Sequence, residues 1–184
     1  FGSESYPLIT YSDGLDVHQK FDFKKEDNRK IGVFRLQEEN LLKTIEEQLS
    51  EGGIVGIIVN TVKRAQELAQ LLSGKFSDED VEILHSGFIA TERIRKEQEL
   101  LKMIGKGAKR PYKKIIIGTQ VIEQSLDIDF DVLISDLAPM DLLIQRIGRL
   151  HRRDIERPKK HKFPQFFVLG TNETLEFESG ASVV

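Results

Sequence analysis

Residues 115–153 decide the fold of this 184-residue chain, and they read IIIGTQVIEQSLDIDFDVLISDLAPMDLLIQRIGRLHRR. Two short apolar runs, at 115–117 and 132–134, are bounded by Gly, Asp and Ser. Such runs are typical of strands that are buried on both faces of a parallel sheet. The polar loop between them carries Asp127, Asp129 and Asp131. After Pro139 the apolar spacing becomes helical, so the stretch predicts strand, loop, strand and helix.

The stretch ends in a cluster of basic residues, namely Arg146, Arg149, His151, Arg152 and Arg153. Gln145, Arg149 and Arg152 fall at spacings of four and three, and on the predicted helix these three residues project from one stripe. A basic stripe is usually a solvated helix face. Here the stripe follows a strand closely, so we expect it near the carboxyl edge of the sheet, where open α/β folds bind ligands. Guanidinium groups placed there suit phosphate, which they grip through paired hydrogen bonds.

Strand-like and helix-like segments alternate on both sides of this stretch. Further strands are predicted at 31–36, 54–59, 81–84 and 166–169. Helices are predicted at 41–49, at 62–72 after an Asn60-Thr61 cap, and after a Thr91 cap with Ile94, Leu101 and Ile104 as the apolar residues. Alternation of this kind predicts right-handed crossovers between parallel strands. The fold class is therefore α/β, with three layers: a mostly parallel sheet and helices on both of its faces.

The chain divides into three regions by composition. Its length and its 39% hydrophobic content suit one sizeable core, which we place at 31–170. Residues 1–30 predict an entry arm or interdomain connector, with a strand-like run at 6–11 and a turn at Asp13-Gly14. Residues 171–184 predict a mobile acidic tail.

Charge is unevenly distributed along the chain. The net charge of −3 alone argues against nucleic acid, yet 102–162 carries an excess of Lys and Arg, so the rest is correspondingly acidic. A basic half is a better indicator of nucleic-acid binding than the overall charge. Its two basic loops, 106–114 and 157–162, are equally consistent with phosphate contact and with a solvated surface.

Several classes of site are excluded or disfavoured. No phosphate-binding loop of the form G-x-x-x-x-G-K-[ST] occurs, and Asp78-Glu79-Asp80 precedes a strand where a magnesium-binding acidic motif should follow one. The chain contains no His-Asp pair and no cysteine, which suits a reducing cytoplasm. No apolar run approaches the roughly 20 residues of a membrane span, so no membrane partner is expected.

Four motifs, in order, resemble those of the second motor domain of superfamily 2 helicases. The run 145–152 resembles the closing Q-R-x-G-R-x-x-R motif, and 118–127 resembles the motif before it. The runs 57–61 and 84–86, the latter with Thr91 and Arg93, resemble the two earlier motifs. The wording at 119–131 is most similar to the CRISPR-associated helicase-nuclease of type I systems, although Gly87 stands where that family often has arginine.

The resemblance implies the second RecA-like domain of an ATP-driven motor that moves on single-stranded DNA. ATP and Mg²⁺ would be held mainly by the first RecA-like domain of the same protein, and no metal site is expected here. Implied roles are arginine fingers (Arg149, Arg152), a contact to nucleotide or attacking water (Gln145), a ribose contact (Asp127) and DNA-backbone contacts (Asn60, Ser86, Thr119). A CRISPR RNA-guided surveillance complex is an implied partner. By itself the chain is expected to be inactive.

Two alternatives stay open at this point. One is half of another superfamily 2 motor, such as an RNA helicase, against which Glu123-Gln124-Ser125 stands in place of the common A-R-G. The other is a non-enzymatic nucleic-acid-binding module, which the complete set of Gln145, Gly148, Arg149 and Arg152 disfavours. Asn60 and His85 also have purely structural interpretations, as a helix cap and as a satisfied buried histidine.

Overall fold

The computed structural model describes residues 8–20, 30–124 and 126–170. The predicted acidic tail at 171–184 and the start of the strand-like run at 6–11 lie outside these ranges. The chain divides into two units, Phe1–Lys30 and Ile31–Val184, which are described separately below.

A β-hairpin makes up the described part of the first unit. Strands β1 (Ile9–Ser12) and β2 (Val17–Lys20) pair antiparallel, with Tyr11 opposite His18. The predicted turn at Asp13-Gly14 is confirmed, since Gly14 has φ +95° and the Asp13 carboxylate accepts from the amides of Leu15 and Asp16. Those amides and His18 lower the pKa of Asp13 to about 2.

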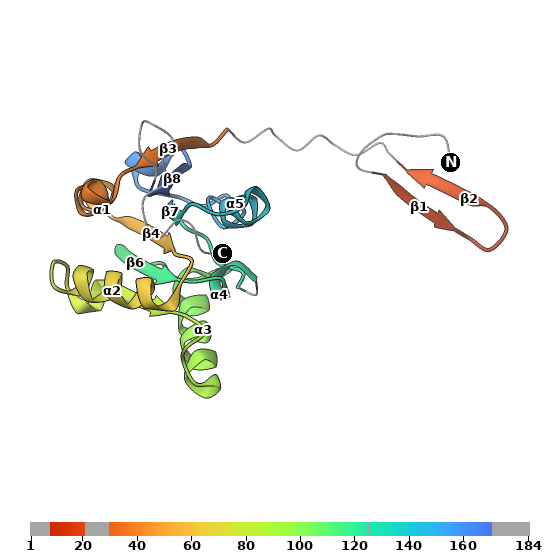
Figure 1. The fold of residues 1–184 in the computed structure, drawn as a ribbon. Coiled ribbons are helices and arrows are strands. Elements are labelled where there is room, and N and C mark those ends of the chain that lie inside the picture. The colour runs from red at the N-terminus through yellow and green to blue at the C-terminus, as the bar shows by residue number, and fades with distance from the viewer. Residues whose placement is uncertain (1–7, 21–29, 125, 171–184) are drawn as a thin grey trace. The chain divides into compact units, whose positions relative to one another are not determined.

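A six-stranded sheet forms the centre of the second unit (Figure 1). Its strands are β3 (Gly32–Leu36), β4 (Gly53–Ile58), β5 (Val81–Leu84), β6 (Lys113–Gly118), β7 (Val132–Asp136) and β8 (Gln165–Leu169). Their order is β3-β8-β7-β4-β6-β5, and every pairing is parallel. All residues of the central strands β4 and β7 are buried, which explains why the sequence shows them as continuous apolar runs.

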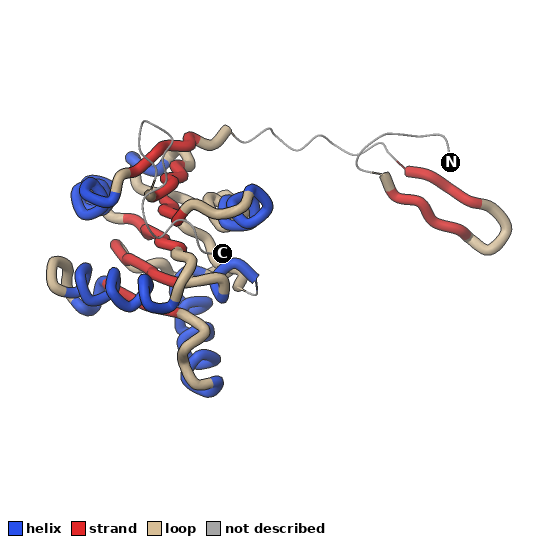
Figure 2. Tube along the Cα trace, viewed as in Figure 1, coloured by secondary structure: helices blue, strands red, loops and turns tan. Residues whose placement is uncertain are grey.

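Helices cover both faces of the sheet (Figure 2). Helices α1 (Leu41–Leu49) and α2 (Val62–Ser73) pack on one face, where Ile45 and Leu72 join a core with β4. Helices α3 (Ala90–Ile104), α4 (Val121–Gln124) and α5 (Met140–Ile147) contribute to a second core on the other face. The described part of this unit also contains 3₁₀ turns at Glu38–Asn40, Asp78–Asp80 and Lys159–His161. The predicted three-layer α/β architecture is confirmed.

The first residues of α2 and α3 show whether the predicted side-chain N-caps are formed. Thr61 caps α2, because its hydroxyl accepts from the Arg64 amide at 3.2 Å. The Thr91 cap is wrong: α3 already begins at Ala90, after Ile89, and has no side-chain cap.

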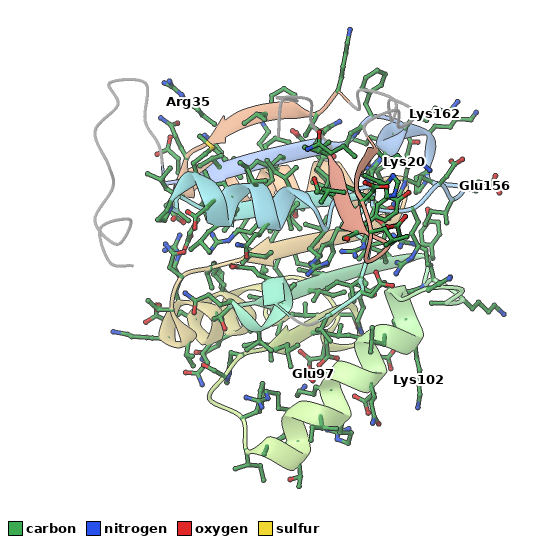
Figure 3. The ribbon with its side chains drawn as sticks, turned by 90° about the vertical axis from the view of Figure 1, so that its right-hand side faces the viewer. Lys20, Arg35, Glu97, Lys102, Glu156 and Lys162 are labelled. Atoms are coloured by element: carbon green, nitrogen blue, oxygen red, sulfur yellow. The ribbon has the colours of Figure 1, made fainter. Side chains whose placement is uncertain are left out.

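The predicted apolar stripe of α3 is also largely wrong. Ile94 is 51% exposed and Leu101 37% exposed, whereas Leu100 and Ile104 are buried. The buried side chains of α3 are Leu100 and Ile104, four residues apart on one face, so Ile94 and Leu101 lie outside that face. Figure 3 shows this helix at the margin of the core, with Glu97 and Lys102 labelled on it. Within the described ranges no helix is long and apolar enough to cross a membrane.

Candidate nucleotide and nucleic-acid site

The helix ends before Arg149, so of the arginines in this segment only Arg146 is helical. Helix α5 ends at Ile147 with Gly148 as its C-cap. The following residues pair instead with Phe130, whose amide donates to the Arg149 carbonyl at 2.9 Å and whose carbonyl accepts from the His151 amide at 3.1 Å. His151 takes a left-handed conformation, with φ 47°. This main-chain pairing bends the segment away from the helical path.

Two expectations are therefore wrong. Arg149 and Arg152 do not share a helical stripe with Gln145, because the helix has already ended. They also do not stand at the carboxyl edge of the sheet, because Phe130 precedes the first residue of β7. Helix α5 begins beyond the carboxyl end of β7 and runs back along it, which carries the arginines toward the amino end. Gln145 remains exposed on α5.

Arg149 is partly buried and incompletely satisfied. Its Nη2 donates to the Glu123 main-chain carbonyl at 2.6 Å, and its Nε is buried without a hydrogen-bond partner among the described residues. Burial lowers the pKa of Arg149, and the positive charge of Arg152 acts in the same direction. The guanidinium thus donates to a neutral carbonyl while its buried Nε has no partner among the described residues, in surroundings that disfavour an uncompensated cation.

Arg152 is exposed, and its side chain reaches Asp127. Its Nε lies 2.9 Å from Asp127 Oδ1, while Arg153 Nη2 lies 2.7 Å from Asp127 Oδ2. The hydrogen bond from Arg153 lowers the pKa of Asp127, and the charges of Arg153, Arg152 and Arg149 do the same. The structure thus brings Asp127 together with Arg152, and the carboxylate is occupied by two arginines.

Arg146 is the functional candidate that the sequence reasoning missed. Its side chain is 0% exposed, although it belongs to the same basic cluster. It donates to Glu123 Oε1 (2.7 Å), Ser135 Oγ (2.8 Å), the Asp136 carbonyl (3.1 Å) and Asn60 Oδ1 (3.2 Å). A signal was available: Arg146 follows the buried Leu143 by three positions, so helical periodicity places it on the core-facing side of α5.

The three candidate DNA contacts follow three neighbouring strands. Asn60 follows β4, Thr119 follows β6 and Ser86 follows β5. Because these strands are parallel and adjacent, their ends lie at one edge of the sheet. Ser86 is exposed, whereas Thr119 is 5% exposed and its main-chain amide donates to the Leu84 carbonyl at 3.3 Å.

Asn60 forms hydrogen bonds within the chain through its main-chain amide, its side-chain amide and its side-chain oxygen. Its main-chain amide donates to Asp136 Oδ2 at 2.9 Å, and its side-chain amide donates to the Leu137 carbonyl at 2.9 Å. Its Oδ1 accepts from Arg146. Asn60 therefore joins the ends of β4 and β7, and Thr61 rather than Asn60 supplies the side-chain cap of α2. His85 is likewise buried, and its Nδ1 accepts from the Gly87 amide at 3.1 Å.

Several residues of the two basic loops have partners inside the domain. Arg157 pairs with both Asp129 and Asp131, two buried carboxylates of the loop expected to be polar. Arg110, from the other basic loop, lies 2.8 Å from Asp131 Oδ2 and donates to the Asp129 carbonyl. These pairs remove two arginines and two carboxylates from the charged surface together, so they leave the basic excess of 102–162 unchanged but show which of its arginines have partners within the domain. The sequence could not show this, because the partners lie far apart along the chain.

The arginine segment carries guanidinium donors of the kind that phosphate oxygens accept. Arg149 offers a buried Nε without a partner, and Arg152 offers an exposed guanidinium beside it. Among the described residues no cluster of His, Asp and Glu could hold a metal ion. A nucleotide contacting this surface would thus meet donors for its phosphate oxygens from this chain.

Comparison with known proteins identifies the family of the chain. Residues 51–155 match the family model described as "CRISPR-associated nuclease/helicase Cas3, C-terminal". The chain is 62% identical to a CRISPR-associated nuclease/helicase Cas3 of Streptococcus thermophilus over 181 residues, covering 98% of this chain and 20% of that protein. It thus spans about a fifth of the length of such relatives.

Solved structures show the same fold. A crystal structure of T. fusca Cas3-ATP matches with a TM-score of 0.80 at 29% identity, over 98% of this chain and 24% of that one. A chain of a structure described as "CRISPR RNA-guided surveillance complex, pre-nicking" matches with a TM-score of 0.77 at 29% identity, over 97% and 24%. The architecture is that of the RecA-like domain of these helicases.

Proposed function

Because the chain belongs to the Cas3 family of CRISPR-associated nuclease/helicases, we propose that it is the second RecA-like motor domain of an ATP-dependent DNA helicase or translocase. The complete protein acts in CRISPR interference against invading DNA, in the cytoplasm. The observation that carries this proposal is the incompletely compensated Arg149 guanidinium, next to Arg152, in the motif that resembles the one closing a superfamily 2 motor domain.

Arg149 and Arg152 act as the arginine fingers of the ATP site. Arg149 has a free buried donor, and Arg152 exchanges its ion pair with Asp127 for phosphate oxygens. Gln145 contacts the nucleotide or the attacking water, and Asp127 faces the ribose side. ATP supplies the phosphoryl group whose transfer drives the motor, with Mg²⁺ held mainly by the first RecA-like domain. Fingers that arrive only when two domains close couple hydrolysis to domain movement.

Asn60, Ser86 and Thr119 form part of the single-stranded DNA path. Ser86 offers an exposed hydroxyl at their common edge, and Asn60 and Thr119 lie at the ends of the two adjacent strands. Polar side chains and main-chain amides of this kind position a nucleic-acid backbone without reading its sequence. The partner that delivers the DNA is a CRISPR RNA-guided surveillance complex, as the likeness to a chain of such a complex supports.

The test is ATP hydrolysis by the full-length protein with single-stranded DNA, with single-stranded RNA, and with neither. We expect stimulation by DNA and little by RNA. Stimulation by RNA alone would favour an RNA helicase. Absence of hydrolysis under all three conditions, with ATP still bound, would favour a nucleic-acid-binding module that kept the fold.

A further inference from the structure

Glu123 accepts hydrogen bonds from the side chains of both Arg146 and Arg149. Its carboxylate oxygen Oε1 accepts from Arg146 Nε at 2.7 Å, and its main-chain carbonyl accepts from Arg149 Nη2 at 2.6 Å. Glu123 lies on α4, whereas both arginines lie at or just after the end of α5. One residue of α4 therefore sets the places of two arginines of the closing motif.

The Glu123–Arg146 pair is fully removed from water, since both side chains are 0% exposed. A buried ion pair contributes little net stability compared with apolar residues of similar volume, but it fixes the relative position of the groups that make it. The planar guanidinium of Arg146 is also bound by Ser135, Asp136 and Asn60. The pair thus locks α4 and α5 to the ends of β4 and β7.

The Arg149 side chain has few hydrogen-bond partners, which suits a side chain that moves. Glu123 Oε2 and Arg149 Nε are both buried, and neither has a hydrogen-bond partner among the described residues. Arg149 is therefore held by a single main-chain carbonyl, whose position depends on where α4 lies. A guanidinium held by one contact can leave for a phosphate oxygen while its backbone stays anchored to Phe130.

We propose that Glu123 is a positioning residue for Arg149, acting through its main-chain carbonyl and its buried pair with Arg146. The inference rests on the proposed function of Arg149 as a finger. It also connects that finger to the candidate DNA edge, because Arg146 binds Asn60 and the helix that carries Glu123 starts two residues after Thr119. The proposed contact of Asn60 with the DNA backbone and the orientation of the Arg149 side chain therefore depend on one set of hydrogen bonds.

The experiment replaces the pair by apolar residues of similar volume, Glu123→Leu with Arg146→Met, in the full-length protein. Such a replacement commonly preserves the fold. We expect an unchanged melting temperature within a few degrees, ATP affinity within about twofold, and DNA-stimulated turnover reduced at least tenfold. The matched control is Glu82→Leu with Lys96→Met, which removes the partly buried 2.6 Å pair between β5 and α3 and should leave turnover unchanged.

Each outcome decides the inference. Normal turnover in the folded double variant, in a protein that Arg149→Ala inactivates, would overturn the positioning role and leave the proposed function standing. If the unmodified full-length protein shows no DNA-stimulated ATP hydrolysis, the proposed function itself is wrong. If the double variant fails to fold, Arg146→Lys keeps the buried charge but not the planar fork. A folded Arg146→Lys protein should then lose turnover with unchanged ATP affinity, and full turnover would contradict the inference.

Discussion

At the scale of single residues, Arg149 and Arg152 differ in what they touch: a carbonyl for Arg149 and a carboxylate for Arg152. We predict that Arg149→Ala or Arg152→Ala in the full-length protein lowers ATP turnover far more than ATP affinity. Arginine fingers contribute about 10³ to 10⁵ in turnover. Arg149→Lys should rescue poorly, because lysine offers a point charge where a planar fork is needed. Turnover, ATP affinity and melting temperature are measured on the same proteins.

The control for these variants is Arg95→Ala on α3, which removes an exposed arginine paired with Glu99. It should leave turnover and melting temperature nearly unchanged, because exposed substitutions usually stay within about 0.5 kcal/mol. Near-normal turnover in both finger variants would mean that this segment is a solvated turn.

His151 gives a prediction about pH. Burial lowers its pKa to about 4, and the charge of Arg157 acts in the same direction. Between pH 6.5 and 4 the unfolded chain therefore binds a proton that the folded chain does not, so stability falls as pH decreases through this window. After allowance for partial exposure, the loss is of order 1 kcal/mol.

The matched variant is His151→Asn, which does not titrate and which tolerates the left-handed conformation at φ 47°. Urea denaturation of this chain at pH 7 and pH 5 should show a smaller loss of stability in the variant than in the unmodified protein. An equal loss in both would assign the pH dependence to other groups.

At the scale of elements, Asp129 joins the loop before β7 to the segment after α5, because it binds both the Arg152 amide and the Arg157 side chain. Asp129 Oδ1 accepts from the Arg152 amide at 3.0 Å, and its Oδ2 lies 2.7 Å from Arg157. Arg157→Met leaves two buried carboxylates short of a counterion, and breaking a buried pair typically costs about 3–5 kcal/mol. We expect denaturation of this chain to show a loss in that range.

Lys159→Ala, two positions further along, is the control for Arg157→Met because Lys159 is exposed. It should change the free energy of unfolding by less than about 0.5 kcal/mol. A similarly small effect of Arg157→Met would show that Arg110 alone satisfies these carboxylates.

At the scale of the whole molecule, the sequence supplies only one side of the proposed ATP site. The chain lacks the phosphate-binding loop whose amides cradle the phosphates. We therefore predict that purified 1–184 does not hydrolyse ATP, with or without single-stranded DNA. Phosphate release measured against the full-length protein is the check. Steady turnover that DNA stimulates and Arg149→Ala abolishes would contradict this prediction.

The sequence by itself determined the layers of this protein. The apolar runs at 115–117 and 132–134 became β6 and β7, and the helical spacing at 41–49 became α1. These features are local, because strand and helix periods depend on neighbours a few residues away. The order of motifs that indicated the family is likewise written along the chain, and so is the turn at Asp13-Gly14.

The tertiary structure alone decided which charges face water and which are paired. The end of α5 at Ile147, the burial of Arg146 and the pairing of Arg157 with Asp129 and Asp131 depend on residues distant in sequence. Periodicity can place Arg146 on the core-facing side of a helix, but it cannot supply the partner that makes its burial tolerable. A buried cation needs a counterion. For Arg146 this counterion is Glu123, which lies on a different helix and is brought to Arg146 only by the packing of α4 against α5.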